Sequence, residues 1–204
     1  MSNLAPSVFV VDDDQAVRKA VGRLMRSAGL RVSLHASAQE YLVGYDPSAP
    51  GCVVLDLEMP GSSGLDLQDK LVAAGGAPPI IFLTGRGDVR ASVQAMKHGA
   101  VEFLCKPVDE RTLIDAVHNA LEKDRIDRID REELAELRAR LATLTPRECE
   151  VLRHVVAGKA NKVIAAILGT VEKTVKVHRA RAIKKMKAPS LAALVQIAVR
   201  VGIG

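Results

Sequence analysis

The chain of 204 residues is long enough for one large domain or two small ones, and 48% of its residues are hydrophobic. It has no tryptophan and only five other aromatic side chains, two tyrosines and three phenylalanines, so its core must be aliphatic. No apolar run approaches the roughly 20 residues that a membrane span needs. The start of the chain lacks the basic and apolar regions of a signal peptide, and the three widely spaced cysteines fit reduced thiols. These features predict a cytoplasmic protein with no membrane partner.

The net charge of +5 is divided unevenly along the chain. Residues 1–120 carry a net charge of −3 and residues 121–141 a net charge of −1. Residues 142–204 hold 12 Lys and Arg against three acids, a net charge of +9. This asymmetry predicts that the C-terminal part meets a polyanion, and a solvated basic face is the alternative.

Strand and helix patterns alternate over the first 120 residues. The expected strands are 7–11, 31–35, 52–55, 79–83 and 101–104, and the expected helices lie near 15–28, 38–44, 64–74, 88–98 and 110–121. Ser37, Asp88 and Asp109 are start signals for three of these helices. Such alternation predicts an α/β domain with a five-stranded parallel sheet and right-handed crossovers.

Residues 121–141 differ in character, because they contain no Gly or Pro and alternate acids with bases. Opposite charges recur at helical spacing, as in the pair Asp124 and Arg128. We expect a solvated linker helix that is continuous, or nearly so, with the fifth helix. A short coiled coil is the alternative, although the apolar stripe covers fewer than three clean heptads. The predicted boundaries are 1–122 for the first domain, 123–141 for the linker and 142–204 for the second domain.

The second domain is expected to be all-α, with four helices. Thr145 and Glu148 form a capping-box pattern with Pro146 at the first helical position. That helix should end near Gly158, and further helices are expected at about 161–168, 172–186 and 191–201. The second and third of these, separated by Gly169, have the pattern of a helix-turn-helix.

Acidic and basic side chains follow several of the predicted strands. They are Asp12, Asp13 and Asp14 after the first strand, Asp56 after the third, Thr84 after the fourth and Lys106 after the fifth. With the strand order 2-1-3-4-5, the first and third strands are neighbours where ligands bind in open parallel sheets. Asp12, Asp13 and Asp56 should then share a pocket that requires a hard divalent cation such as Mg²⁺. We expect Asp14 to be a helix cap.

This set of groups suits phosphoryl transfer. An ionised Asp56 can attack phosphorus in line, and the metal offsets the charge of the transferred group. Lys106 can pair with a phosphoryl oxygen, and Thr84 can donate a hydrogen bond to one.

The segments FVVDDD, LDLEMPGSSG, FLTGRGD and FLCKP resemble the receiver domain of two-component response regulators, over about residues 6–122. The resemblance implies a flavodoxin-like (CheY-like) fold, Asp56 as phosphoacceptor and a sensor histidine kinase as partner. It also implies that Asp12 and Asp13 bind the metal with the main-chain carbonyl of Glu58. Thr84, Lys106 and Phe103 would then be the groups that respond to phosphorylation.

The predicted third helix of the second domain is strongly basic. It carries Lys173, Lys176, Arg179, Arg181, Lys184, Lys185 and Lys187, and its apolar residues Val175, Ala182, Ile183 and Met186 can face inward. Such a helix suits the major groove of DNA, where phosphates supply affinity and base edges supply specificity.

Residues 142–204 resemble the LuxR-type DNA-binding domain, so the whole chain resembles response regulators of the NarL/FixJ class. Promoter DNA is the implied partner, with RNA polymerase as a further partner. By spacing, Lys176 and Val177 are the best candidates for base contacts, with Arg179 or Arg181 joining. Thr174, Lys162 and Lys184 are expected to contact phosphates. The chain departs from relatives at Val171, where a Ser cap is common, and at Ala180, where some place a base-reading lysine.

The predicted function is therefore a transcription regulator switched by aspartate phosphorylation, with no catalytic activity beyond self-dephosphorylation. A phosphoester hydrolase, or a DNA-binding module with an inert receiver, are the alternatives. Phosphorylation is expected to promote a homodimer through residues 90–97, 101–103 and 111–118. In the alternative, the unphosphorylated receiver covers the recognition helix and phosphorylation releases it.

Overall fold

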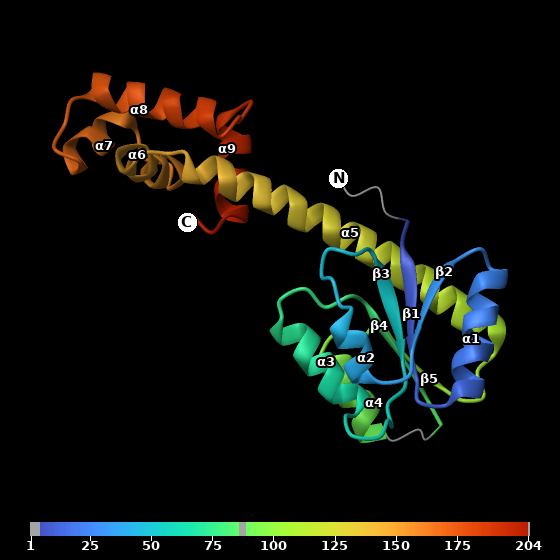
Figure 1. Ribbon diagram of the computed structural model, residues 1–204. Helices are drawn as coiled ribbons and strands as arrows, with labels where there is room; N and C mark the ends of the chain where they lie inside the picture. Colours follow the sequence, from blue (N-terminus) through green and yellow to red (C-terminus); the bar gives the residue numbers. More distant parts are fainter. Residues whose placement is uncertain (1–4, 86–88, 204) are drawn as a thin grey trace. The chain divides into compact units, whose positions relative to one another are not determined.

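The computed structural model describes residues 5–85 and 89–203 (Figure 1). The chain divides into two compact units, residues 1–127 and residues 128–204. Asp88, the predicted start signal of the fourth helix, lies outside the described residues. Within the described ranges, no helix combines the length and the apolar character that crossing a bilayer requires.

The first unit contains a five-stranded parallel sheet in the order β2-β1-β3-β4-β5, which confirms the predicted α/β fold. Its strands are β1 (Ser7–Val11), β2 (Arg31–His35), β3 (Gly51–Leu55), β4 (Ile80–Thr84) and β5 (Glu102–Cys105). Every predicted strand is present, with bounds that differ by at most one residue at each end. The strands β3 and β4 are buried along their whole length because helices cover both faces of the sheet.

Helices cover both faces of the sheet (Figure 1). They are α1 (Gln15–Ser27), α2 (Ala38–Val43), α3 (Gly64–Ala73), α4 (Val89–Lys97) and the first part of α5 (Glu110–Ala142). Alternate residues of one strand face opposite cores. Val53 and Leu55 pack with residues of α2, α3 and α4, whereas Cys52 and Val54 pack with residues of α1 and α5. This alternation follows from the two-residue period of a strand.

Local capping fixes where several of these helices begin. The Asp14 side chain accepts hydrogen bonds from the backbone N–H groups of Ala16 and Val17, which confirms the prediction that it caps a helix. Ser37 caps α2, and Ser63 and Asp66 form a capping box at the start of α3. The capping box of Ser63 and Asp66 lies close to the end of β3, so it orients the loop that follows this strand.

The helix α5 is a single helix of 33 residues. Its first part buries Leu113 and Val117 against the sheet. Asp124, which reads as a linker residue in the sequence, is only 2% exposed, and its Oδ2 accepts a hydrogen bond of 2.9 Å from the backbone N–H of Gly51. Contacts with the sheet therefore continue along α5 past residue 122.

The second unit contains four further helices after the end of α5. They are α6 (Pro146–Val156), α7 (Asn161–Ile167), α8 (Glu172–Lys185) and α9 (Leu191–Arg200). Their shared core includes Leu152, Ile164, Val175 and Leu194. The capping box of Thr145 and Glu148 is present. The buried Glu148 carboxylate also accepts a 2.6 Å hydrogen bond from Lys185, and this contact links α6 to α8.

We predict that Asp124→Ala destabilises the first unit by about 1–3 kcal/mol, because the buried N–H of Gly51 loses its acceptor. Asp115→Ala on the same helix is the matched control, because Asp115 is exposed and its loss should cost less than about 0.5 kcal/mol. Urea unfolding followed by tyrosine fluorescence reports on this unit alone, since the two tyrosines of the chain are Tyr41 and Tyr45. Equal stability of the two variants would contradict the role given to Asp124.

Candidate functional site

Three carboxylates meet at the C-terminal edge of the sheet. Asp12 follows β1 and Asp56 follows β3, and these two strands are neighbours at the point where the strand order reverses. Asp12, Asp13 and Asp56 each offer an oxygen, and these oxygens all lie within 4.8 Å of one another. Asp12 and Asp56 are buried, whereas Asp13 is exposed. The structure therefore brings together the three acids that were predicted to share a pocket.

Lys106 extends from the end of β5 into the same pocket. Its Nζ lies 2.7 Å from Asp12 Oδ2 and 3.1 Å from Asp56 Oδ1. Burial lowers the pKa of Lys106, but the hydrogen bonds and charges of Asp12 and Asp56 outweigh it, so this pKa is raised. Burial raises the pKa of Asp56, Lys106 opposes that rise, and the charge of Asp12 adds to it. Lys106 is thus the counter-ion of two crowded carboxylates.

Asp12 is further held by contacts that the sequence alone does not reveal. The backbone N–H of Asp14 donates to Asp12 Oδ1 at 2.9 Å, and the guanidinium of Arg18 donates to the Asp12 carbonyl. Arg18 lies on α1 one turn after the helix begins. The separation of six residues between Asp12 and Arg18 is only weak evidence for this contact in the sequence, because a basic residue in the first turns of a helix is usually solvated.

The remaining predicted residues of this edge lie on β4 and β5 or follow β3. Thr84 is fully buried at the end of β4, and its carbonyl accepts a 2.7 Å hydrogen bond from the backbone N–H of Lys106. Phe103 is half-buried on β5, with its ring 6.0 Å from that of Phe82. Glu58 is exposed two residues after Asp56. Thr84 and Lys106 thus flank the carboxylates, whereas the Phe103 ring packs beside the Phe82 ring.

Gly64 allows a close approach beneath Asp56. A Cβ at this position would lie 2.4 Å from the Asp56 carbonyl oxygen and 2.9 Å from the Phe82 ring, so no other residue fits without a shift of the backbone. The N–H of Gly64 also donates to the Leu57 carbonyl at 2.9 Å. Gly64 therefore fixes the backbone of Asp56 at the C-terminal edge of the sheet. In the sequence, the only sign of this role is that Gly64 ends the segment PGSSG.

The donor set of the pocket fits a hard divalent cation. It consists of carboxylate oxygens from three residues, two of which are buried, with a bend of the backbone directly after Asp56. Cations such as Mg²⁺ prefer oxygen ligands and commonly use only one or two protein carboxylates with water. Asp13 is exposed, so solvent reaches this side of the acidic cluster.

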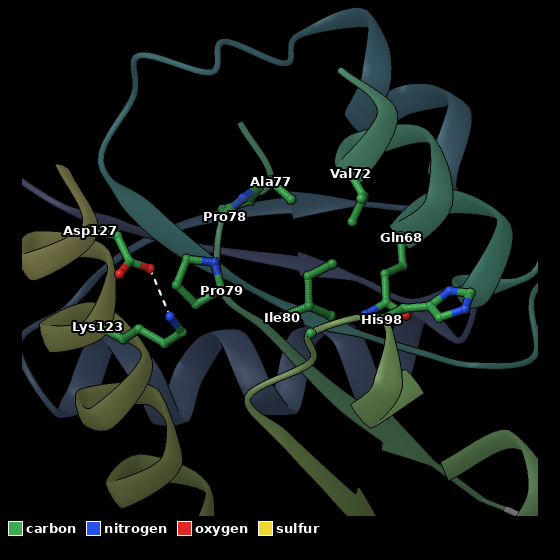
Figure 2. Close-up of a pocket in the computed structure, with 10 residues that line it drawn as sticks. Gln68, Val72, Ala77, Pro78, Pro79, Ile80, His98, Lys123 and Asp127 are labelled. Carbon is green, nitrogen blue, oxygen red and sulfur yellow. Dashed lines mark hydrogen bonds and ion pairs between the residues drawn. The ribbon is translucent and has the colours of Figure 1, made fainter. Parts of the chain in front are cut away.

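A small polar cavity of about 100 Å³ lies at the other end of the sheet, beside the first residue of β4 (Figure 2). Gln68, Pro79, Ile80 and His98 line it, and an ion pair of 2.8 Å joins Lys123 to Asp127 at its wall. None of the three clustered acids contributes to this lining. The cavity is therefore separate from the acidic pocket.

In the second unit, α7 and α8 pack against each other as a helix-turn-helix. The predicted inward residues Val175, Ala182 and Met186 of α8 are buried. Opposite them lies an arc of exposed residues that we call the recognition face: Lys173, Lys176, Val177, Ala180, Arg181 and Lys184. Lys173 and Ala180 of this face were not among the predicted contact residues, although their helical positions place them at its middle.

The other predicted DNA-contacting residues lie beside the recognition face. Lys162 is exposed on α7, and Thr174 is half-buried on α8. Arg179 is also half-buried, and its Nη1 donates a 3.1 Å hydrogen bond to Asn161 Oδ1. Arg179 therefore connects the two helices of the motif, and at least part of its guanidinium is used for that contact.

Comparisons with known proteins match both units. The profile of the response regulator receiver domain matches residues 8–118, and that of the bacterial regulatory proteins of the luxR family matches residues 142–198. Nodulation protein W of Bradyrhizobium diazoefficiens is 45% identical over 96% of this chain and 86% of its own length. Transcriptional regulatory protein FixJ of Azorhizobium caulinodans is 43% identical over 96% and 93%. The solved structure of response regulator StyR is 43% identical, with a TM-score of 0.82 over 96% of this chain and 99% of that one.

We predict that Asp56→Asn is more stable than the unchanged protein at pH 7 in the absence of divalent cations. Burial raises the pKa of Asp56 above its ordinary value of 3.8, so its ionisation opposes folding. Protonation of Asp56 removes this cost. The resulting stability is present below the pKa that Asp56 has in the unfolded chain, and it is lost as the pH rises through the higher pKa that Asp56 has in the folded protein. Asn carries no charge, so the advantage of the variant should shrink as the pH falls from 7 towards 4. Urea unfolding at several pH values measures it.

Asp66→Asn is the control, because its effect on the free energy of unfolding at pH 7 should have the opposite sign. Hydrogen bonds from Ser63 lower the pKa of Asp66, so this carboxylate stabilises the fold above its unfolded pKa and ceases to do so as the pH falls through the folded pKa. Asp66→Asn should therefore be less stable than the unchanged protein at pH 7. If Asp56→Asn were also destabilised at pH 7, the ion pair with Lys106 would outweigh the cost of burying the Asp56 carboxylate.

Proposed function

The chain belongs to the NarL/FixJ class of two-component response regulators, and we propose that Asp56 is its phosphoacceptor. As a member of this class it is a transcription regulator controlled by phosphorylation. Its receiver implies a kinase as partner, and its LuxR-type domain implies DNA binding. The observation that carries the assignment of Asp56 is its position among Asp12, Asp13 and Lys106 at the C-terminal edge of the sheet.

We propose that Asp12, Asp13 and Asp56, with the main-chain carbonyl of Glu58, hold Mg²⁺ in this pocket. The metal would supply positive charge that offsets the charge of the transferred group. A carboxylate oxygen of Asp56 attacks the phosphorus of a phosphohistidine on a sensor histidine kinase. The new O–P bond forms as the N–P bond breaks, and the departing imidazole nitrogen takes a proton from solvent. Apart from accepting the phosphoryl group on Asp56, the receiver would promote at most the loss of that group to water.

The charge of the phosphoryl group then rearranges the pocket. A phosphorylated side chain gains roughly −1.5 to −2 charges at neutral pH. Lys106, which contacts Asp12 and Asp56 in the unphosphorylated pocket, would pair with a phosphoryl oxygen, and the Thr84 hydroxyl would donate to another. Movement of Thr84 would leave space into which the Phe103 ring turns, away from the Phe82 ring.

We propose that α8 enters the major groove of promoter DNA, in the cytoplasm. Lys176, Val177 and Arg181 face the bases, while Lys162, Thr174 and Lys184 contact phosphates. Arg179 orients α8 through its hydrogen bond to Asn161, and only its remaining donors reach DNA. The net charge of +9 on residues 142–204 supports this assignment, and RNA polymerase is the proposed further partner.

The phosphoacceptor assignment predicts one phosphoryl group per chain after incubation with acetyl phosphate and Mg²⁺. Intact-mass measurement should detect it on the unchanged protein and on Asp66→Asn, but not on Asp56→Asn, and hydroxylamine should remove it. Labelling of Asp56→Asn at the full level would contradict the assignment. Release of phosphate without a labelled protein would instead favour a hydrolase, and DNA binding by a protein that is never labelled would favour an inert receiver.

We further propose that phosphorylation promotes a homodimer through the face formed by residues 90–97, 101–103 and 111–118. Support comes from the exposed apolar side chains of Val93 and Met96 on α4. A two-fold dimer gains affinity because it binds two half-sites about one helical turn apart. RNA polymerase contact would follow DNA binding.

The dimer model predicts that light scattering at micromolar concentration detects a doubled mass after phosphorylation, together with tighter operator binding. The fragment 128–204 should bind the operator more weakly than the phosphorylated full chain. Under the release model, the fragment should bind as tightly as the phosphorylated chain. A monomer mass that does not change while DNA binding is switched on would exclude the dimer model.

A further inference from the structure

The small polar cavity beside the start of β4 lies at the end of the sheet opposite to Asp56 (Figure 2). Gln68 of α3 and His98, which follows α4, lie on one side of the cavity, and Lys123 of α5 lies on the other, with Ile80 between them. Its volume of about 100 Å³ is that of roughly three water molecules. All the residues that line the cavity belong to the first unit, so it is a feature of the receiver itself.

Gln68 is a buried polar residue of this cavity that the folded chain satisfies only in part. Its side chain is 1% exposed, and its Nε2 donates a 3.1 Å hydrogen bond to the Ala95 carbonyl. Its Oε1 is buried and accepts no hydrogen bond from any residue in the ranges 5–85 and 89–203. The neighbouring Leu67 and Leu71 of α3 are fully buried, so an apolar residue would also suit this position and would avoid an acceptor without a donor.

The hydrogen bond to Ala95 does not account for Gln68 either. The Ala95 carbonyl also accepts the N–H of Ala100 at 3.0 Å, so it keeps a partner without Gln68. Because a carbonyl can only accept, this bond also determines that Oε1, and not Nε2, is the amide atom that lacks a partner. The group that would complete the cavity is therefore a hydrogen-bond donor.

The loop that leads into β4 adds acceptors to the cavity and few donors. Pro78 and Pro79 both line it, and neither has a backbone N–H, so this stretch of the wall can offer only carbonyl oxygens. A ligand that brings more than one N–H group therefore suits the cavity better than one that brings only acceptors.

The charged side chains of the wall already face partners. Lys123 Nζ lies 2.8 Å from Asp127 Oδ2, and His98 Nδ1 lies 2.7 Å from Asp69 Oδ1. A charged ligand would have to compete with these pairs, whereas an uncharged NH2 group needs only acceptors. A primary carboxamide supplies two N–H donors without a charge, and its alkyl group can lie against the apolar side chain of Ile80.

We propose that this cavity binds a small uncharged primary carboxamide, whose NH2 group donates a hydrogen bond to Gln68 Oε1. The cavity is then a second binding site of the receiver, separate from the acidic pocket, because none of the three clustered acids lines it. Gln68 is the residue that selects a donor, and the paired charges at the rim select against an ion. The site goes beyond the function proposed above and does not depend on it.

Titration of the ¹⁵N-labelled full-length chain with acetamide, followed by NMR spectroscopy, tests this directly. We expect the resonances of the Gln68 NH2 group and of the Ile80 N–H to shift and to saturate, with a dissociation constant on the order of millimolar for so small a ligand. Acetate is the matched control ligand, because it has nearly the same shape but carries a carboxylate in place of the carboxamide. It has no N–H to donate, so it should bind at least about tenfold more weakly.

Gln68→Met supplies the protein variant, because it removes the acceptor and retains the length of the side chain. Its affinity for acetamide, read from the Ile80 N–H, should fall by about tenfold or more. Gln39→Met is the matched control, because Gln39 is exposed on α2 and does not line the cavity, so acetamide should bind as it does to the unchanged protein. Circular dichroism checks that both variants are folded. The comparison of acetamide with acetate uses only the unchanged protein, so it tests the site even if Gln68→Met does not fold.

Three results would overturn the proposal. Shifts that are absent, or that grow in proportion to the acetamide concentration without saturating, would show an adventitious additive only. Equal affinity for acetate and acetamide would show that no donor is selected. Undiminished binding of acetamide to a folded Gln68→Met would show that Oε1 is not the acceptor. Phosphorylation of Asp56 is measured separately, so failure of this site would leave the phosphoacceptor assignment intact.

Discussion

The ion pairs of Lys106 with Asp12 and Asp56 set the charge balance of the acidic pocket at the C-terminal edge of the sheet. The two buried carboxylates repel each other, and burial raises the pKa of Asp56. The Lys106 ammonium, 2.7 Å and 3.1 Å from their oxygens, offsets both effects in part and joins the ends of β1, β3 and β5 at one edge of the sheet. A group that brings new charge to Asp56 must redistribute these contacts, so the resting arrangement already defines what phosphorylation can change.

The strand β3 gives this pocket a direct structural connection to α5. Asp56 follows its last residue, and Gly51, its first residue, donates its N–H to the buried carboxylate of Asp124 on α5. Gly64 holds the opposite side of the Asp56 backbone, because a side chain there would collide with the Asp56 carbonyl. The Asp56 backbone is thus fixed at α3, and the strand that leads to it is fixed at the long helix α5.

Much of this arrangement can be predicted from the sequence, because it follows from local patterns and one topological rule. Apolar runs and caps such as Ser37 and Thr145 define the elements, and the strand order then brings Asp12, Asp56 and Lys106 together. Local sequence patterns do not predict that a polar side chain is held by a partner far away in the sequence. Asp124 reads as one of many linker charges, and Arg179 as a base-reading cation, until their partners Gly51 and Asn161 are known. The expected continuity of the fifth helix with the linker is confirmed, because α5 runs without a break from Glu110 to Ala142.

Calorimetric titration of Mg²⁺ into the full-length protein and into Lys106→Met, at low ionic strength, tests whether the Lys106 ammonium balances the charges of Asp12 and Asp56. If Lys106 is the counter-ion of the resting pocket, Mg²⁺ must either displace the Lys106 ammonium or bind close to its positive charge. Methionine retains the apolar stem of the side chain without that charge, so we expect tighter Mg²⁺ binding by Lys106→Met. Equal or weaker Mg²⁺ binding by Lys106→Met would contradict the claim that the ammonium of Lys106 balances Asp12 and Asp56.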